Sequence, residues 1–379
     1  MDMETETPLL LEKIFTDKGL ADTTQRSYNN SVAYFEEYTD KTIYEVIQTH
    51  EKETQKGILW RDSTLKGDLV NFRKEMYDEY KKDTAREYYG KIIAILNFYE
   101  VTIGKLPPIR KDNSSILRDV DELPDQETLK LCVNLNNNQL LKSSALILAH
   151  TGLSPVDLLK MTFEEYLKGT EKYHNYNTHH NIKLAIFEMK EQDVIAVFKG
   201  ERQKTKTQYI TFASPEAIKA TNMYILTRED EYTLDSPIFK TSRRHFNKIY
   251  QDVNDKLKLG VTSEGIRVFS PKNLRSYHAT QLEIAGMSDS RIDILQGRKP
   301  QSIIRKHYVK VNTSVLRDEY IQCLPYLVVE DINRVKTELD VTKEKLEVKT
   351  TENTKLKKEL DKLDDVMARL DKLESERED

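Results

Sequence analysis

The sequence predicts a mainly α-helical protein with one small antiparallel β-sheet, of the α+β class, followed by a C-terminal coiled coil. Three observations lead to this prediction. Apolar residues recur at helical spacing over most of the first 330 residues, they alternate with polar residues between positions 181 and 212, and a heptad pattern runs from residue 332 to the end. With 379 residues the chain exceeds the usual size of one hydrophobic core, so two domains are expected before the coiled coil.

Residues 8–106 are predicted to form a small helical domain. Apolar residues follow helical spacing in 23–39, 65–82 and 83–104, and we expect Thr23 to cap the first of these helices and Gly104 to end the last. Residues 105–124 show no such periodicity, alternate in charge and contain three prolines. A linker is therefore expected at residues 107–123.

Residues 124–326 are predicted to form a second domain that is mainly helical. β-branched residues alternate with polar ones in 181–190 and 193–212, so a small antiparallel sheet is expected there. Helices are expected at 125–135, at 138–167 with a break at the Gly152–Pro155 turn, and at 214–229, 242–258, 270–286 and 288–297.

Residues 328–376 are predicted to form the coiled coil. Mostly apolar residues recur every seven positions from Ile332 to Met367, and again three positions further along. Asn353 stands at the kind of core position that fixes register and strand number. A solvated single helix and a disordered charged tail are the alternatives. A coiled coil here would serve self-association or bind a partner.

The composition excludes several classes of protein. No apolar run reaches about 18 residues and the N-terminus is acidic, so we expect a cytoplasmic protein with no membrane span or signal peptide. Cys132 and Cys323 are too few for a disulfide framework and form no metal-ligand pattern. The three histidines of a polar segment lack acidic or cysteine partners at ligand spacing, and an exposed loop is expected there: His174, His179 and His180.

The net charge of −4 conceals a basic region. Residues 330–379 contain 16 acids and 12 bases, which accounts for the whole imbalance. Residues 240–310 contain 15 bases and 6 acids, the local excess expected of a surface that faces phosphate groups.

Four basic residues and a tyrosine follow one another at positions suited to phosphodiester chemistry. Lys204 lies at the turn of the predicted hairpin, and Arg275 follows Lys272 by three residues near a helix start. Arg298 comes 23 residues after Arg275, and Tyr308 follows ten residues later. A phenol is a poor nucleophile at neutral pH, and its attack on phosphorus builds up negative charge that cations stabilise.

In these residues the chain resembles the tyrosine recombinases, or phage-type integrases, over roughly residues 20–326. The resemblance implies a helical core-binding domain followed by a catalytic domain that acts on double-stranded DNA at an attachment site. It also implies that several protomers, a tetramer in this family, assemble on DNA, and that neither a metal nor another cofactor takes part.

The resemblance assigns a role to each of the five residues. Tyr308 matches the nucleophile that becomes joined to the 3′ phosphate, and Lys204 the lysine that protonates the leaving 5′ oxygen. Lys272 and Arg275 match the His/Lys-x-x-Arg pair, and Arg298 stands where most members have histidine. Lysine at 272 and arginine at 298 resemble integrases of archaeal viruses and plasmids, which are mobile genetic elements.

One position departs from the family pattern. The family's first arginine lies in TGLR, whereas this sequence reads TGLSPVDLL, with Ser154 at that position and Asp157 as the acidic partner. Loss of one preorganised donor typically costs on the order of 100- to 1000-fold in rate. Another cation such as Arg202 or Lys160 replaces it, the lineage works slowly without it, or the chain is a catalytically impaired homologue that binds DNA.

Further basic residues are candidates for DNA contact, with an exposed salt-bridged surface as the alternative. Lys206 neighbours Lys204 in the hairpin, and Arg243 and Arg244 lie at a helix start in the basic region. The full set of candidates is Arg202, Lys206, Arg243, Arg244, Lys299, Arg305 and Lys306.

Overall fold

The computed structural model describes residues 6–107, 122–299 and 312–330. The chain divides into two units, Met1–Ser115 and Ile116–Asp379, called here the N-terminal and the C-terminal unit. Each has its own hydrophobic core. The described residues are mainly helical and include one two-stranded antiparallel sheet, so the predicted fold class is confirmed.

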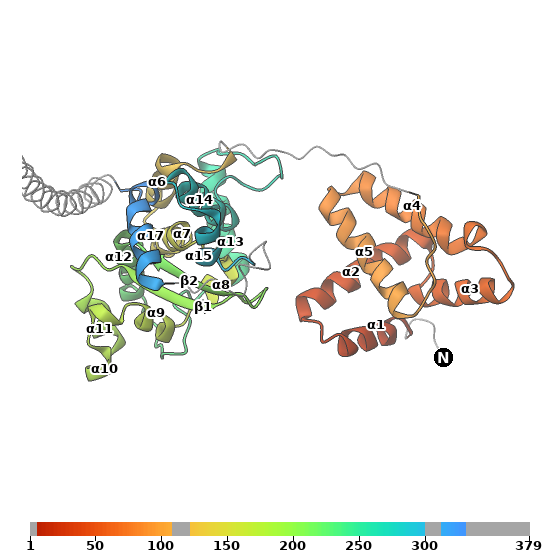
Figure 1. The fold of residues 1–379 in the computed structure, drawn as a ribbon, viewed down its shortest axis with the longest axis horizontal. Helices are drawn as coiled ribbons and strands as arrows, with labels where there is room; N and C mark the ends of the chain where they lie inside the picture. The colour runs from red at the N-terminus through yellow and green to blue at the C-terminus, as the bar shows by residue number, and fades with distance from the viewer. Residues whose placement is uncertain (1–5, 108–121, 300–311, 331–379) are drawn as a thin grey trace, which may run out of the picture. The chain divides into compact units, whose positions relative to one another are not determined.

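The N-terminal unit is helical throughout its described part (Figure 1). Its elements are α1 (Glu6–Asp17), α2 (Asp22–Thr39), α3 (Ile43–Gln55), the 3-10 turn η2 (Trp60–Asp62), α4 (Thr64–Glu79) and α5 (Lys82–Phe98). The core contains the fully buried Phe35 and Phe72, whose rings meet edge to face with centroids 5.0 Å apart. Thr42 and Glu45 form a capping box that starts α3.

Two predicted helix ends in this unit are wrong. The helix expected to be capped by Thr23 starts at Asp22 with Ala21 as its N-cap, so Thr23 lies inside it. The helix expected to end at Gly104 ends at Phe98, because the chain turns at Glu100, which has a φ of 57°. Gly and Asn are the residues that usually adopt this left-handed conformation, so a glutamate at this position does not predict a helix end from the sequence.

The C-terminal unit is built around one central buried helix. This helix, α7 (Gln139–Thr151), is buried at every position from Ser143 to Thr151. It packs against α12 (Pro215–Leu226), α14 (Pro271–Ile284) and strand β2 (Gln208–Ala213). The other elements are α6 (Gln126–Asn134), α8 (Pro155–Lys160), α9 (Phe163–Gly169), η4 (Glu171–Tyr173), α10 (Tyr176–His179), α11 (Ile182–Glu188), β1 (Ala196–Glu201), α13 (Arg243–Lys256), α15 (Asp289–Gln296) and α17 (Thr313–Leu327).

The sheet is a single hairpin. Strands β1 and β2 pair antiparallel from Ala196 opposite Ala213 to Glu201 opposite Gln208. Residues 202–207 connect them, so Lys204 lies in the turn, as predicted. The inner end of the hairpin is buried through Ala196, Phe212 and Ala213.

The strand expected at 181–190 is a wrong prediction, because most of this segment is helix α11. Asn181 caps the helix by accepting a hydrogen bond from the Leu184 amide. Ala185, Ile186 and Met189 are buried, which is helical spacing. The loop expected around the three histidines is also wrong in part, since η4 and α10 occupy most of it.

Three helices of the C-terminal unit start with a Ser-Pro pair. Ser154, Ser214 and Ser270 are N-caps whose hydroxyl oxygens accept a backbone hydrogen bond, and proline follows at the first helical position. Proline suits this position because it has no amide hydrogen to leave unpaired. The starts of α8, α12 and α14 are therefore fixed by local sequence.

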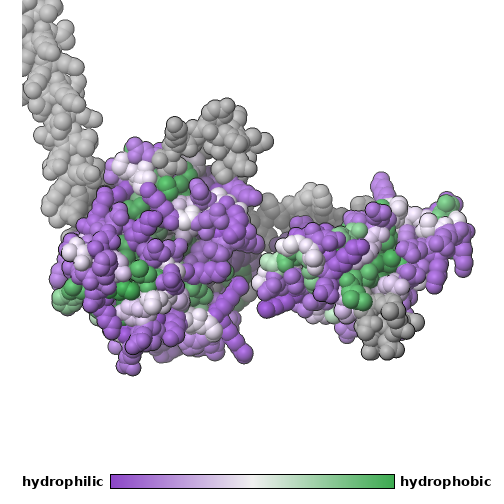
Figure 2. Space-filling view, turned by 90° about the horizontal axis from the view of Figure 1, so that it is seen from below, coloured by the Kyte–Doolittle hydropathy of each residue, from purple (hydrophilic) through white to green (hydrophobic). Residues whose placement is uncertain are grey.

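Figure 2 shows one face of each unit, on which hydrophilic residues surround smaller hydrophobic areas. Within the residues that the structure covers, no helix is both long and apolar enough to cross a membrane. The predicted linker at 107–123 and the predicted coiled coil at 328–376 lie almost wholly outside the described residues, so both stay predictions.

Candidate active site

Arg275 is held by backbone carbonyl groups from two other elements. From α14, its Nη1 donates to the carbonyl oxygen of Gly152 at the end of α7, and its Nη2 donates to that of Gln296 at the end of α15, at 2.6 Å. Carbonyl groups orient a guanidinium but do not cancel its charge. Burial, and next the charges of Arg202 and Arg298, lower the pKa of Arg275 to about 9. It is therefore still protonated at neutral pH.

A buried polar cluster supports Arg275 from behind. Gln296 Nε2 donates to the Arg275 carbonyl oxygen at 2.9 Å and lies 3.0 Å from Nδ1 of His278. His278 has no exposed surface, and burial, followed by the charge of Arg275, lowers its pKa well below the ordinary value. His278 is therefore neutral at pH 7 and acts as a packing and hydrogen-bonding group.

Gly152 permits this close arrangement. Its φ is 63°, and a Cβ at this position would lie 2.5 Å from His278 Nδ1 and 2.9 Å from Gln296 Nε2. Both the backbone conformation and the lack of space thus require glycine. The carbonyl oxygen of Gly152 reaches Arg275 because α7 ends here.

Ser154 and Asp157 join the start of α8 to the β1–β2 hairpin. Ser154 Oγ donates to Asp157 Oδ2 at 2.5 Å and accepts from the Asp157 amide at 3.3 Å. The other carboxylate oxygen, Oδ1, accepts from the amide of Gln203 in the hairpin connection at 2.9 Å. Asp157 is buried, so these bonds are shielded from water.

Arg202 enters the site from the same connection. Its Nε lies 3.8 Å from Asp157 Oδ2, and its side chain is 17% exposed. Its Cγ and Cδ pack on Gly297, where an added Cβ would lie 3.0 Å from both. Gly297 directly follows Gln296, whose carbonyl group holds Arg275. Two arginines from different elements therefore flank the end of α15.

The site has an excess of positive charge. The charges of Arg202 and of the exposed Arg298 lower the pKa of Arg275, and those of Asp157 and Asp293 raise it. Three guanidinium groups against two carboxylates leave a net positive site with donors that suit phosphate oxygens. We call Arg202, Arg275 and Arg298 the arginine cluster.

The other predicted site residues that the structure describes lie on several elements of the C-terminal unit. Lys204 is exposed in the hairpin turn, and Lys206 beside it lies 3.4 Å from Glu201. Lys272 Nζ lies 3.3 Å from Glu264 Oε2. Arg243 and Arg244 are exposed at the start of α13, and Lys299 is exposed after α15. Three predicted residues lie outside the described residues: Tyr308, Arg305 and Lys306.

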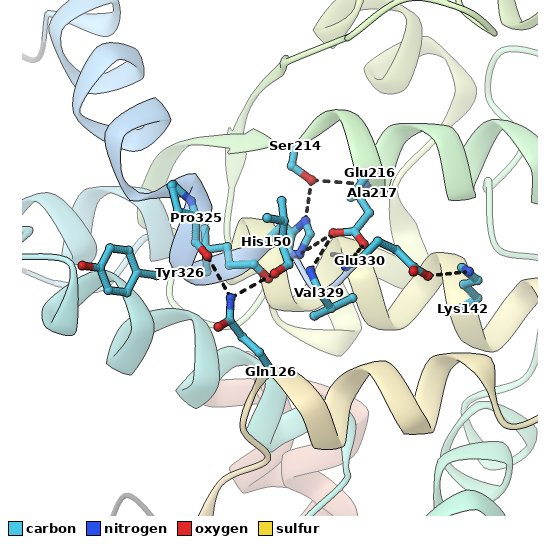
Figure 3. A network of polar contacts seen from close by, with 12 residues as sticks. Gln126, Lys142, His150, Ser214, Glu216, Ala217, Pro325, Tyr326, Val329 and Glu330 are labelled. Carbon is cyan, nitrogen blue, oxygen red and sulfur yellow. Dashed lines mark hydrogen bonds and ion pairs between the residues drawn. The ribbon is translucent and has the colours of Figure 1, made fainter. Parts of the chain in front are cut away.

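A second polar network holds the C-terminal end of the described chain (Figure 3). Gln126 Nε2, at the start of α6, donates to the carbonyl oxygens of Pro325 and Val328, each at 2.9 Å. Glu216 of α12 accepts from the amides of Val329 at 3.1 Å and Glu330 at 2.9 Å. We call residues 325–330 with these partners the C-terminal anchor.

His150 completes the anchor from α7. Its Nε2 lies 2.9 Å from the Leu327 carbonyl oxygen and 3.7 Å from Glu216 Oε2, and its Nδ1 lies 2.5 Å from Ser214 Oγ. Burial lowers the pKa of His150 to about 4, against the effect of the Leu327 carbonyl. Burial raises the pKa of Glu216 to about 7, against the two amide hydrogen bonds. Helix α17 is thereby tied to three other helices.

Sequence reasoning missed Gly152, His278, Gln296 and the whole anchor. A signal existed for His278, which lies one helical turn after Arg275, and for Gln296, which directly precedes Gly297. For the anchor the sequence offers little, since Gln126, His150 and Glu216 are far apart along the chain. Their shared role depends on how the helices pack.

No protein-family model matches the chain, and no curated protein matches it. Among solved structures, the chain is similar to XerA recombinase, with 16% identity over 84% of this chain and 98% of that one and a TM-score of 0.32. It is also similar to the Tn1549 transposon integrase in complex with circular intermediate DNA, with 12% identity over 83% and 98% and a TM-score of 0.45. A third is XerH site-specific recombinase bound to difH substrate, with 12% identity over 81% and 82% and a TM-score of 0.47.

Proposed function

We propose that this chain is a tyrosine recombinase, a site-specific DNA recombinase or integrase that cleaves and rejoins DNA through a covalent 3′-phosphotyrosine intermediate. The observation that carries the proposal is the arginine cluster. Arg275 is fixed by two carbonyl groups, with Arg202 and Arg298 close enough to affect its pKa. Such preorganised donors are what a phosphodiester needs when negative charge builds up on it.

Each residue has a role in the proposed reaction. The oxygen of Tyr308 attacks phosphorus and gives its proton to solvent water, and the bond from phosphorus to the 5′ oxygen breaks. Lys204 donates a proton to that oxygen, so a free 5′ hydroxyl leaves. Arg275 and Arg298 stabilise the phosphorane, and Lys272 positions the phosphate. Rejoining reverses these steps, which therefore require no metal or nucleotide.

The exposed basic residues bind DNA outside the reacting phosphate in this proposal. Arg243 and Arg244 at the start of α13 contact the phosphate backbone, and Lys206 and Lys299 do so beside the cluster. Arg305 and Lys306 belong to the same set. In this proposal residues 8–106 are the core-binding domain and residues 124–326 the catalytic domain, and both bind the duplex.

Strand exchange between two duplexes requires several protomers, and we propose a tetramer on DNA. The predicted coiled coil at 328–376 assists this assembly or binds a partner. The proposed site of action is the cytoplasm, where a mobile element such as an archaeal virus or plasmid would be integrated.

A duplex with a nick beside the cleavage position tests the proposal. Cleavage of such a substrate releases a short fragment and traps the protein on DNA, which denaturing electrophoresis detects. Because the target sequence must first be found, binding selection from a library of duplexes precedes the assay. Wild-type protein should form the covalent adduct, and Tyr308→Phe should bind the same duplex with similar affinity and form none. An adduct that persists in Tyr308→Phe would refute the assignment of the nucleophile.

The second candidate is a DNA-binding protein without recombinase activity. The observation that favours it is the state of Ser154, whose hydroxyl hydrogen is already donated to Asp157 and which therefore offers no donor to a phosphate. In this case wild type and Tyr308→Phe should bind DNA equally, and neither should form an adduct.

A further inference from the structure

We propose that Arg202 contacts the scissile phosphate and supplies the positive charge that Ser154 cannot. This inference rests on the proposed function and adds a catalytic residue to it. The charge comes from the hairpin connection and not from the start of α8, where the family pattern has it.

Arg202 lies close to position 154. Ser154 Oγ and Arg202 Nε both face the same oxygen, Asp157 Oδ2, at 2.5 Å and 3.8 Å. Arg202 and Ser154 therefore lie on either side of one carboxylate, and Arg202 is placed to supply a charge close to position 154. The hairpin is held there independently, since the Gln203 amide donates to Asp157 Oδ1 at 2.9 Å.

The Arg202 guanidinium has a donor without a hydrogen-bond partner among the described residues. Arg275 donates to two carbonyl oxygens, whereas no hydrogen bond from the Arg202 side chain to another described residue is found. Its Nε is buried and unpaired, and the carboxylate of Asp157 is beyond hydrogen-bonding distance from it. A buried donor without an acceptor is costly, and an anion at this place would satisfy it.

Arg202 also lies close to the other two arginines of the cluster. Arg202 packs on Gly297, the residue between Gln296 and Arg298. The charge of Arg202 is the largest electrostatic influence that lowers the pKa of Arg275, ahead of Arg298. Two guanidinium groups that repel each other at a half-buried site are stabilised together by a shared phosphate between them.

Neighbouring cations fit this role less well. Lys160 donates to Gln203 Oε1 at 3.0 Å and is exposed. Lys206 lies 3.4 Å from Glu201, with a side chain that is 68% exposed. Lys160 is on α8, the helix that Ser154 caps, so Lys160→Ala provides a matched control for a change of charge in this region.

The test measures the rate of covalent adduct formation and the affinity for the same nicked duplex. Arg202→Ala should lower the rate by on the order of 100-fold or more, with the affinity changed by less than about fivefold. Lys160→Ala should stay within about fivefold of wild type in rate, since its side chain donates to Gln203 at an exposed position. Ser154→Arg introduced into Arg202→Ala should restore at least about tenfold of the lost rate.

A second substrate separates charge from structure. In a duplex whose scissile phosphate is a neutral methylphosphonate, the reacting group carries one negative charge less, and the need for a second guanidinium falls. The loss caused by Arg202→Ala should therefore shrink to about tenfold or less on this substrate. A loss of the same size on both substrates would mean that Arg202 supports the fold of the site, and it would overturn the inference.

Two further outcomes distinguish failure of the inference from failure of the proposed function. If Arg202→Ala reacts within about threefold of wild type on the normal substrate, Arg202 is not the missing charge and the inference fails while the proposed function stands. If wild-type protein forms no adduct although it binds the duplex, the proposed function itself fails, and the inference fails with it.

Discussion

Asp157 accepts the hydroxyl hydrogen of Ser154 at a distance of 2.5 Å between Oδ2 and Oγ. Since Asp157 also accepts from the Gln203 amide and faces Arg202, one carboxylate joins the start of α8 to the hairpin. The departure from the family pattern at position 154 therefore has a structural counterpart. A serine here caps α8 by accepting a hydrogen bond from the Asp157 amide, and an arginine side chain has no acceptor with which to do so.

Replacement of Asp157 by Asn should impair both stability and reaction. The amide keeps the size of the side chain, but it has one acceptor in place of two and no charge opposite Arg202. We expect a loss of about 1–3 kcal/mol in the free energy of unfolding and a fall of about tenfold or more in adduct formation. Urea denaturation and the nicked-duplex assay measure the two effects. Ser154→Ala, which removes the cap alone, should cost about 1 kcal/mol; equal effects of the two variants on the reaction would contradict this account.

Gly152→Ala should be strongly destabilising, because the change imposes two separate costs. Alanine at a φ of 63° is strained by about 1–2 kcal/mol, and its Cβ would also overlap His278 and Gln296. Gly260→Ala is the matched control, since Gly260 has a φ of 77° but no atom within 4 Å of the added Cβ. Thermal or urea unfolding should show a loss of at least about 3 kcal/mol for Gly152→Ala and about 1–2 kcal/mol for Gly260→Ala. Equal losses would show that the space behind Arg275 is not tight.

The two titrating groups of the anchor should give opposite pH dependence. His150 has a pKa of about 4 when folded against an ordinary 6.5, so acidification from pH 6.5 to 4 protonates the unfolded state and lowers stability. Glu216 has a pKa of about 7 when folded against an ordinary 4.5, so acidification from pH 7 to 4.5 protonates the folded state first and raises stability. Over the shared range the two effects oppose each other.

Glu216→Gln removes one of these effects and leaves the other. The difference in unfolding free energy between variant and wild type should therefore grow, to the disadvantage of the variant, by on the order of 3 kcal/mol as the pH falls from 7 to 4.5. Urea denaturation at several pH values measures this difference. Parallel pH profiles for the two proteins would contradict a raised pKa for Glu216.

Gln126→Ala should loosen the C-terminal anchor. It leaves the carbonyl groups of Pro325 and Val328 without their shared donor, at a cost of about 1–3 kcal/mol. Limited proteolysis should then cleave within 325–330 faster than in wild type. Gln139→Ala provides the control, because Gln139 donates to Asn137 at an exposed position. Similar cleavage of both variants would show that Gln126 does not secure this segment.

Arg243→Ala and Arg244→Ala should change the salt dependence of DNA binding. Each phosphate contact that is lost should reduce the slope of log affinity against log salt concentration by about one. Fluorescence anisotropy over a range of salt concentrations measures the slope. Lys248 lies on the same helix but pairs with Asp252 at 2.6 Å, so Lys248→Ala should change the slope less. Unchanged slopes in both arginine variants would remove α13 from the proposed interface.

The fold was predictable from the sequence where local signals decide the structure. The Ser-Pro starts of α12 and α14 and the alternation in β1 and β2 correspond to elements of the structure. The strand prediction for residues 181–190 was wrong because Ile182, Leu184 and Ile186 alternate as in a strand. The residues that are buried are Ala185, Ile186 and Met189, which follow helical spacing. Tertiary packing chose between two periods that both fit a short segment.

The candidate site was predictable only in part, because its residues gain their roles through backbone contacts. The sequence singles out Arg275 and Arg298, and it offers Arg202 and Lys160 as equal substitutes for the missing arginine. It cannot show that carbonyl groups of Gly152 and Gln296 hold Arg275, or that Asp157 brings the hairpin to α8. Those contacts join residues up to 123 positions apart.

The C-terminal anchor and the arginine cluster share the last turn of α7. His150 contacts the anchor, and Gly152, two residues later, holds Arg275. In mechanical terms, a pull on the chain beyond Glu330 is borne first by the side chains of Gln126 and Glu216 and by His150, and not by α17 alone. His150 and Gly152 lie at the same end of α7, so the contact with the anchor is two residues from the carbonyl group that orients Arg275. A force applied to the chain after Glu330 would therefore act on His150, two residues before Gly152, whose carbonyl group holds Arg275.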